Sequence, residues 1–243
     1  MQDIRFLIMG DSALTVELGQ DISPEINAKV RALNTAITEN RIGGIVETIP
    51  TYCSVTVSYQ PEIILYDELI RCLEELLGQM EVVDAPLSHV LELPVLYGGE
   101  MGPDIDFVAS HTGKTSDEII KLHAEPEYLI YMLGFTPGFT YLGGLNPELE
   151  TPRLKTPRTK IPAGSVGIAG KQTGVYPTAS PGGWQLIGRT PVKLYDPNRE
   201  NPILPKAGDY IKFIPVNTDE YEAIAGQVSQ GAYECRRYVK AEV

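Results

Sequence analysis

The spacing of apolar residues divides the chain into a mixed first half and a second half made mostly of strands. Apolar residues recur every three or four positions from Ile26 to Ile37, behind the N-cap pair Ser23-Pro24, and this predicts a helix. A second amphipathic helix is predicted around Leu69–Leu77. Short apolar or alternating runs predict strands at 5–9, 13–18, 45–49, 55–59 and 90–95. With the two runs around the turn pair Gly10-Asp11 counted as one β unit, the order is β-α-β-β-α-β. This order is close to a ferredoxin-like unit, so we predict an α+β domain over residues 1–96.

The pattern changes after residue 96. Turn residues and two short helices, one capped by Asp104 and one opened by the capping box Thr115-x-x-Glu118, predict a helical linker over 97–127. From residue 128 onward short apolar runs alternate with turns, and Gly and Pro supply about a third of residues 134–191. This pattern is typical of a β-barrel with ordered loops, which we place at 128–243.

Charge is distributed unevenly along the 243 residues. The formal net charge is −12, which argues against a nucleic-acid-binding surface and against docking on an anionic membrane. Residues 151–195, however, contain seven bases and no acid. Such a segment is a candidate site for a small anion or an acidic partner, unless its bases pair with acids of the first 150 residues.

The cysteines and the pattern of apolar stretches indicate the cellular compartment. The three cysteines are far apart and match no zinc spacing, which predicts reduced thiols in a cytoplasmic protein without a metal site. We find no pattern of a signal peptide and no apolar stretch long enough to span a membrane.

Glycine-rich loops next to the basic segment are the best candidates for a binding site. Their backbone N–H groups can form anion-binding nests, and Arg158 or Arg189 could grip a carboxylate or phosphate. Gln172, Tyr176 and Thr136 could orient an amide. The alternative is that the glycines only turn tight barrel corners. The chain contains none of the common nucleotide-binding glycine motifs and no serine-hydrolase motif.

Among the three histidines, His123 is the best candidate for acid–base work, with Glu100 and Asp104 as partners. The alternative is that His123 is structural, as most single histidines are. The spacing of His, Asp and Glu residues indicates no metal site.

Three long motifs resemble a known family. They are YGGEMGPD at 97–104, YMLGFTPGFTYLGGL at 131–145 and TPRLKTPRTKIPAGSVGIAGKQTGVYPTASPGGWQLIGRTP at 151–191. With the rest of the chain they resemble the KipI/PxpB family, also known as allophanate hydrolase subunit 1. The resemblance implies a small N-terminal domain followed by a cyclophilin-like β-barrel.

The resemblance also implies an activity and partners. It implies an ATP-dependent 5-oxoprolinase, inactive without its PxpC-type and PxpA-type subunits, that opens 5-oxo-L-proline to L-glutamate. ATP with Mg²⁺ would act in the complex, and no tightly bound cofactor is expected. Arg158 or Arg189 would then hold the substrate carboxylate, while His123, Glu100 and Asp104 would transfer protons. Two alternatives stay open: a KipI-like inhibitor of a sporulation histidine kinase, and a subunit related to allophanate hydrolase or urea carboxylase.

Overall fold

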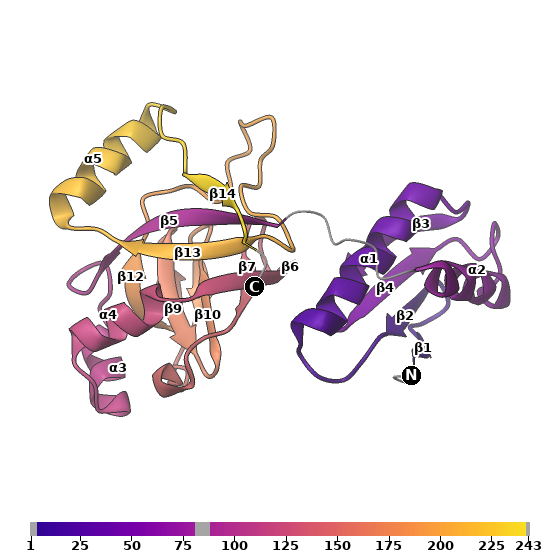
Figure 1. Cartoon of the computed structure of the whole chain (residues 1–243), viewed down its shortest axis with the longest axis horizontal. Coiled ribbons are helices and arrows are strands. Elements are labelled where there is room, and N and C mark those ends of the chain that lie inside the picture. The colour runs from indigo at the N-terminus through magenta and orange to yellow at the C-terminus, as the bar shows by residue number, and fades with distance from the viewer. Residues whose placement is uncertain (1–3, 81–87, 242–243) are drawn as a thin grey trace. The chain divides into compact units, whose positions relative to one another are not determined.

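The chain forms two compact units, each with a hydrophobic core of its own. The computed structural model describes residues 4–80 and 88–241, and the division between the units falls between residues 86 and 87. We call residues 1–86 the N-terminal unit and residues 87–243 the barrel unit (Figure 1).

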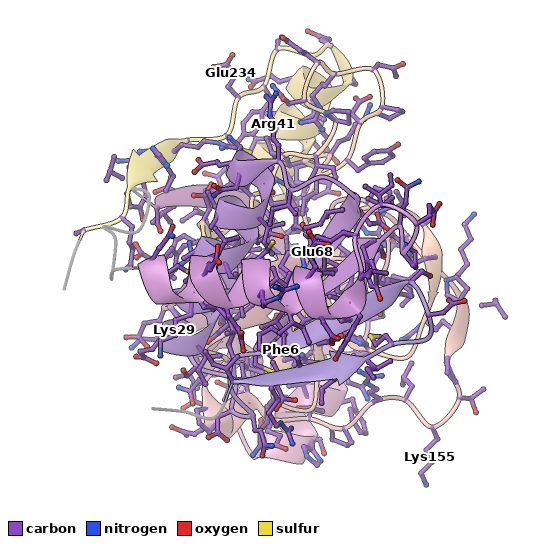
Figure 2. The ribbon with its side chains drawn as sticks, turned by 90° about the vertical axis from the view of Figure 1, so that its right-hand side faces the viewer. Phe6, Lys29, Arg41, Glu68, Lys155 and Glu234 are labelled. Atoms are coloured by element: carbon purple, nitrogen blue, oxygen red, sulfur yellow. The ribbon has the colours of Figure 1, made fainter. Side chains whose placement is uncertain are left out.

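A four-stranded antiparallel sheet and two helices make up the described part of the N-terminal unit. The strands lie in the order β1-β2-β4-β3, and α1 and α2 contribute buried side chains to the same core as β2 and β4. Phe6 of β1 packs against this core (Figure 2). The elements are β1 (Arg5–Ile8), β2 (Ala13–Glu17), α1 (Pro24–Asn40), β3 (Ile45–Pro50), β4 (Ser54–Tyr59) and α2 (Tyr66–Gln79).

Both helices follow the predicted apolar spacing. The hydroxyl of Ser23 accepts a hydrogen bond from the N–H of Ile26 at 3.2 Å, so the predicted cap of α1 is confirmed. A helix with one apolar stripe gains stability by burying that stripe against a sheet, which explains why both helices could be predicted from local spacing. The buried residues of the two stripes are Ile26, Val30, Leu33 and Ile37 in α1 and Leu69, Leu73 and Leu76 in α2.

Seven strands of the barrel unit close into a barrel. They follow the cyclic order β12-β9-β10-β7-β6-β13-β5, and a pairing of β12 with β5 completes the ring. Strand β14 pairs with the other part of β5. The strands are β5 (His89–Tyr97), β6 (Glu127–Leu133), β7 (Thr140–Gly143), β9 (Ser165–Ala169), β10 (Gln172–Val175), β12 (Gln185–Arg189), β13 (Tyr210–Pro215) and β14 (Arg237–Val239). The predicted barrel is confirmed.

Strand β5 corrects the predicted domain boundary. The run 90–95 was expected to complete the first sheet, but β5 pairs in parallel with β13 inside the barrel unit. Val90, Leu91, Leu93 and Val95 are all buried, as expected for a strand covered on both faces rather than on one. The described part of the N-terminal unit therefore has the order β-β-α-β-β-α, and a ferredoxin-like fold is not confirmed.

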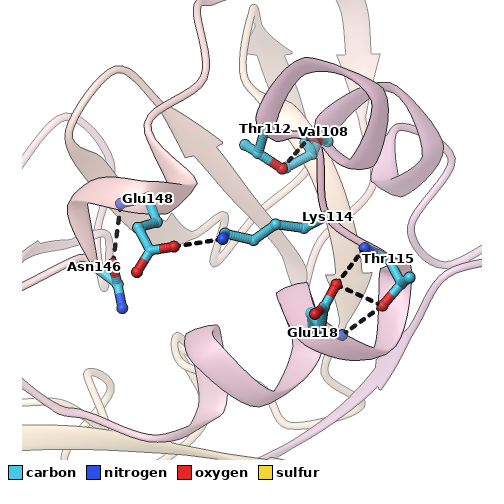
Figure 3. Close-up of polar contacts among 7 residues, drawn as sticks. All are labelled: Val108, Thr112, Lys114, Thr115, Glu118, Asn146 and Glu148. Carbon is cyan, nitrogen blue, oxygen red and sulfur yellow. Dashed lines mark hydrogen bonds and ion pairs between the residues drawn. The ribbon is translucent and has the colours of Figure 1, made fainter.

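The predicted linker 97–127 is also corrected, because its helices belong to the barrel unit. Ile105 and Val108 of α3 (Ile105–Thr112) and Ile119 of α4 (Ser116–Ala124) are buried in the barrel core. Figure 3 shows the Thr115–Glu118 capping box, which is confirmed, and an ion pair from Lys114 to Glu148 in η1 (Pro147–Leu149). Residues 97–127 therefore pack on the barrel instead of bridging two domains.

A second hydrophobic cluster lies outside the barrel core. Its members include Ala169, Tyr176 and Leu186, each adjacent along the chain to a residue whose side chain points into the barrel. Because neighbouring side chains of a strand point to opposite faces, this cluster covers the outer face of β9, β10 and β12. We call it the outer cluster, and its six buried residues are Phe139, Ile161, Ala169, Tyr176, Trp184 and Leu186.

A small ribbon and a late helix complete the unit. β8 (Arg158–Ile161) pairs with β11 (Ser180–Gly182), while α5 (Thr218–Ser229) packs against β5. No helix in the described ranges is long and apolar enough to cross a membrane.

Candidate functional site

His123 lies in the barrel core, with both ring nitrogens hydrogen-bonded. Its side chain is 0% exposed, and its ring stacks on Phe213 with 4.6 Å between centroids. Nδ1 lies 2.8 Å from the hydroxyl of Tyr97, and Nε2 lies 2.7 Å from the hydroxyl of Thr173. The Thr173 hydroxyl also donates to the carbonyl of Gly167 at 3.1 Å. These contacts form one continuous chain of hydrogen bonds.

The direction of these hydrogen bonds shows which atom of each pair carries the proton. Since the single Thr173 proton goes to Gly167, the Thr173 oxygen accepts the Nε2–H of His123, and Tyr97 donates to Nδ1. Burial lowers the pKa of His123 to about 3, so the ring is neutral near pH 7. Burial also raises the pKa of Tyr97 well above its usual value. A neutral, fully bonded and enclosed imidazole does not fit the predicted acid–base role, and a structural role fits it well.

The two acids predicted to work with His123 lie elsewhere. Glu100 is exposed in the turn that follows β5. Asp104 precedes α3, but its carboxylate does not cap that helix. One oxygen accepts from Arg158 at 2.6 Å and the other accepts from the N–H of Leu186 at 2.6 Å. Asp104 therefore joins the start of α3 to β8 and β12, and the predicted proton-transfer set is not assembled.

Arg158, predicted to hold a substrate carboxylate, is already engaged by this carboxylate. Its guanidinium also donates to the carbonyl of Trp184 at 3.3 Å, and its side chain is 30% exposed. The structure thus brings two predicted site residues, Asp104 and Arg158, into one ion pair. Much of the positive charge of Arg158 is compensated within the protein.

The three predicted amide-orienting residues lie at and beside the outer cluster. Tyr176 is buried, with ring centroids 5.7 Å from Phe139 and 6.0 Å from Trp184. Burial raises the pKa of Tyr176 to about 12, against the opposing effect of Arg153 and Arg158. Gln172 is half-buried at the start of β10, on the strand that leads to Tyr176.

Thr136 lies in the neighbouring glycine-rich loop. Its carbonyl accepts from the N–H of Phe139, and its buried hydroxyl has no hydrogen-bond partner in the described residues. The preceding Phe135 is 65% exposed and takes a left-handed φ of 59°, which is uncommon for a bulky residue. This loop holds an exposed aromatic ring beside an unused hydroxyl.

Arg189, the other predicted carboxylate clamp, differs from Arg158. It ends β12, it is only partly exposed, and its buried Nε has no partner among the residues described. It pairs in register with Ser165 of β9, which is 0% exposed and whose hydroxyl is likewise unpartnered in the described structure. The sequence contains no serine-hydrolase motif, and no serine was among the predicted site residues. The position of Ser165 inside the long motif 151–191 was the available signal.

Most bases of the segment 151–195 are not paired with acids. Arg158 pairs with Asp104, and Lys193 pairs with Asp196 at 3.6 Å. Lys155 extends away from its loop (Figure 2). Within the described ranges no ion pair is formed by the remaining five, Arg153, Lys155, Lys160, Lys171 and Arg189. The alternative that these bases neutralise acids of the first 150 residues therefore holds for Arg158 alone in the described part of the chain.

Comparison with known proteins identifies the class and then the family. Residues 4–205 match the family of the carboxyltransferase domain, subdomain C and D. The chain is 42% identical to the 5-oxoprolinase B subunit of Bacillus subtilis, covering 88% of this chain and 94% of that protein. It is also 42% identical to the 5-oxoprolinase B subunit of Escherichia coli O157:H7, covering 88% and 97%. The chain belongs to the KipI/PxpB family, in which both of these relatives are 5-oxoprolinase B subunits.

Two solved structures share the fold of this chain and part of its sequence. A protein named TTHA0988 is 36% identical with a TM-score of 0.75, covering 84% of this chain. This chain spans only 40% of the length of that protein. The conserved protein PH0987 from Pyrococcus horikoshii is 44% identical with a TM-score of 0.53, covering 89% of this chain and 100% of that one.

Proposed function

We propose that this chain is the B subunit of an ATP-dependent 5-oxoprolinase that opens 5-oxo-L-proline to L-glutamate. The observation that carries the proposal is the 42% identity over nearly the whole of the 5-oxoprolinase B subunit of Bacillus subtilis. The chain acts with a PxpC-type and a PxpA-type subunit and is inactive without them. The proposal places it in the cytoplasm.

The proposed reaction needs hydrogen-bond donors from this chain, and it does not need a buried acid–base pair there. A lactam resists hydrolysis at neutral pH. ATP supplies the free energy that activates the lactam when ATP is bound in the complex. The task left to this chain is to hold the substrate and to donate hydrogen bonds to its carboxylate and lactam oxygens. The bases of the segment 151–195, together with the unpartnered hydroxyl of Thr136, suit that task.

The described residues contain no dedicated metal site, and the sequence contains no known phosphate-binding motif. No group of three or more His, Cys, Asp or Glu side chains in the described ranges is arranged to hold a metal ion. The sequence also lacks a glycine motif for holding phosphates. We therefore assign no step of phosphoryl transfer to this chain and propose that ATP with Mg²⁺ acts at the level of the three-subunit complex.

Reconstitution tests the proposal. The chain is purified alone and together with its PxpC-type and PxpA-type subunits, and ATP hydrolysis is measured with 5-oxo-L-proline, allophanate and urea. Stimulation by 5-oxo-L-proline in the three-subunit complex only is expected. Stimulation by allophanate or urea instead would replace the proposal with the amidolyase alternative. An inactive complex together with inhibition of a histidine kinase by the chain alone would support the regulator alternative.

A further inference from the structure

Arg189 is held rigidly at one end of the barrel. Its strand β12 pairs with β9 through Ser165 and with β5 through Leu96, so the backbone is bonded on both sides. The next residue, Thr190, donates its N–H to the carbonyl of Gly164 at 2.9 Å. Gly164 has φ of 81°, and a Cβ there would lie 2.2 Å from the carbonyl oxygen of Thr190. The loop before β9 is thus locked onto the strand that carries Arg189.

Ser165 and Arg189 lie side by side with unused hydrogen-bonding groups. Residues paired in register on neighbouring strands point to the same face, with their Cβ atoms about 5 Å apart. The Ser165 hydroxyl and the Arg189 Nε are both buried, and neither has a hydrogen-bond partner in the described structure. A buried donor without a partner is costly, so two adjacent ones call for an explanation. A bound acceptor would satisfy both.

We propose that Arg189 and Ser165 form a binding site for a small carboxylate. If the proposed function holds, on which this assignment of the ligand rests, the carboxylate is that of 5-oxo-L-proline. Arg189 carries the charge, because Arg158 is neutralised by Asp104 whereas Arg189 has no ion pair in the described residues. A guanidinium binds a carboxylate through two parallel hydrogen bonds, and the Ser165 hydroxyl can donate to the same group.

A binding measurement on the full chain tests the site directly. The Nε–H resonance of Arg189, identified by its loss in Arg189→Lys, is followed by NMR during titration with 5-oxo-L-proline, its neutral primary amide and inorganic phosphate. A saturable shift with 5-oxo-L-proline and none with the amide is expected. No saturable shift, the same shift with the amide, or tighter binding of phosphate than of 5-oxo-L-proline would overturn the carboxylate site.

Variants in the three-subunit complex separate this site from the proposed function. Arg189→Gln is expected to raise KM for 5-oxo-L-proline about 10- to 100-fold, and Arg189→Lys less. Lys206→Gln, an exposed base of the barrel unit outside the segment 151–195, serves as the control and should leave KM unchanged. An active wild-type complex with unaltered KM in Arg189→Gln overturns the site and leaves the proposed function standing. A wild-type complex with no response to 5-oxo-L-proline rejects the proposed function, and the titration still decides the carboxylate site.

Ser165→Ala adds a readout that a structural role would not produce. Removing an unpartnered buried hydroxyl should leave Tm unchanged or higher, while KM rises about 3- to 10-fold. A fall in Tm with unchanged KM would show that the hydroxyl supports the fold and would remove Ser165 from the site.

Discussion

Two buried polar groups of the barrel unit, around His123 and around Arg189, have opposite hydrogen-bonding states. Inside the barrel, His123 has a partner on each ring nitrogen, and Thr173 passes the chain on to a backbone carbonyl. At the barrel end, Ser165 and the Nε of Arg189 have no partner within the described ranges. A completed network stabilises one packing of the core, whereas an incomplete one favours a ligand that completes it. Burial alone therefore does not distinguish a structural polar residue from a binding residue. The presence or absence of hydrogen-bond partners within the protein does.

The largest expected effect comes from removing His123. His123→Ala leaves a cavity in the core and strips Tyr97 and Thr173 of a partner, so the free energy of unfolding should fall by about 3–5 kcal/mol. Urea unfolding followed by circular dichroism measures it. His111→Ala, in the exposed last turn of α3, is the matched control and should change the stability little. A loss below about 1 kcal/mol would contradict a structural role for His123.

Acid should unfold the protein through the same residue. The folded pKa of His123 is about 3, below its unfolded value of about 6.5, so the unfolded chain takes up the proton first. This contribution to stability is complete above the unfolded pKa. It is lost as pH falls from about 6.5 toward 3, by up to about 1.4 kcal/mol per pH unit. Urea midpoints measured between pH 7 and 4 give the slope, and His123→Gln, which cannot gain a proton there, should flatten it. Equal slopes in both proteins would exclude His123 as the source.

Breaking the Asp104–Arg158 pair should have an intermediate effect. Arg158→Ala leaves the mostly buried Asp104 carboxylate without its cation, so we expect a loss of about 1–3 kcal/mol, moderated by solvent because Arg158 is partly exposed. Asp104→Asn combined with Arg158→Ala should recover part of that loss. If Arg158→Ala abolished turnover in the complex at unchanged stability, Arg158 would rejoin the candidates for substrate binding.

The smallest expected effects on stability come from removing a single buried hydroxyl near His123 or near Arg189. These two changes test the comparison between the two groups most directly. Thr173→Val removes the acceptor of His123 and a donor to Gly167, and should cost about 1–3 kcal/mol. Ser165→Ala removes a hydroxyl of similar burial, 0% exposed in both residues, but should cost nothing measurable in the free protein. Thermal unfolding of the two variants measures the difference. Equal losses would mean that Ser165 has a structural partner after all.

Local pattern predicted the local elements well. The Ser23 cap, the buried stripes of α1 and α2 and the Thr115–Glu118 box depend on residues within a few positions of each other, and each could be predicted. The alternation of short apolar runs with glycine and proline was enough to predict the barrel. The same pattern misplaced β5, because a continuous apolar run does not reveal which strands lie beside it.

The candidate site was predicted as a region rather than as a set of roles. The acid-free segment 151–195 contains Arg158, Ser165, Tyr176 and Arg189, so its location followed from charge and glycine content. The sequence did not predict which of these side chains form an ion pair within the protein and which keep unused hydrogen-bonding groups. Asp104 and Arg158 are 54 positions apart, and His123 meets a partner 50 positions away in Thr173.

By itself, the sequence determined the helices, most strands, the uneven charge and the family, because each depends on neighbouring residues or on long contiguous motifs. Only the tertiary structure decided that His123 is enclosed and neutral, that Arg158 is neutralised and that Arg189 and Ser165 keep unused donors. The physical reason is that burial and hydrogen bonding depend on pairings between distant strands. Composition and periodicity along the chain do not specify those pairings.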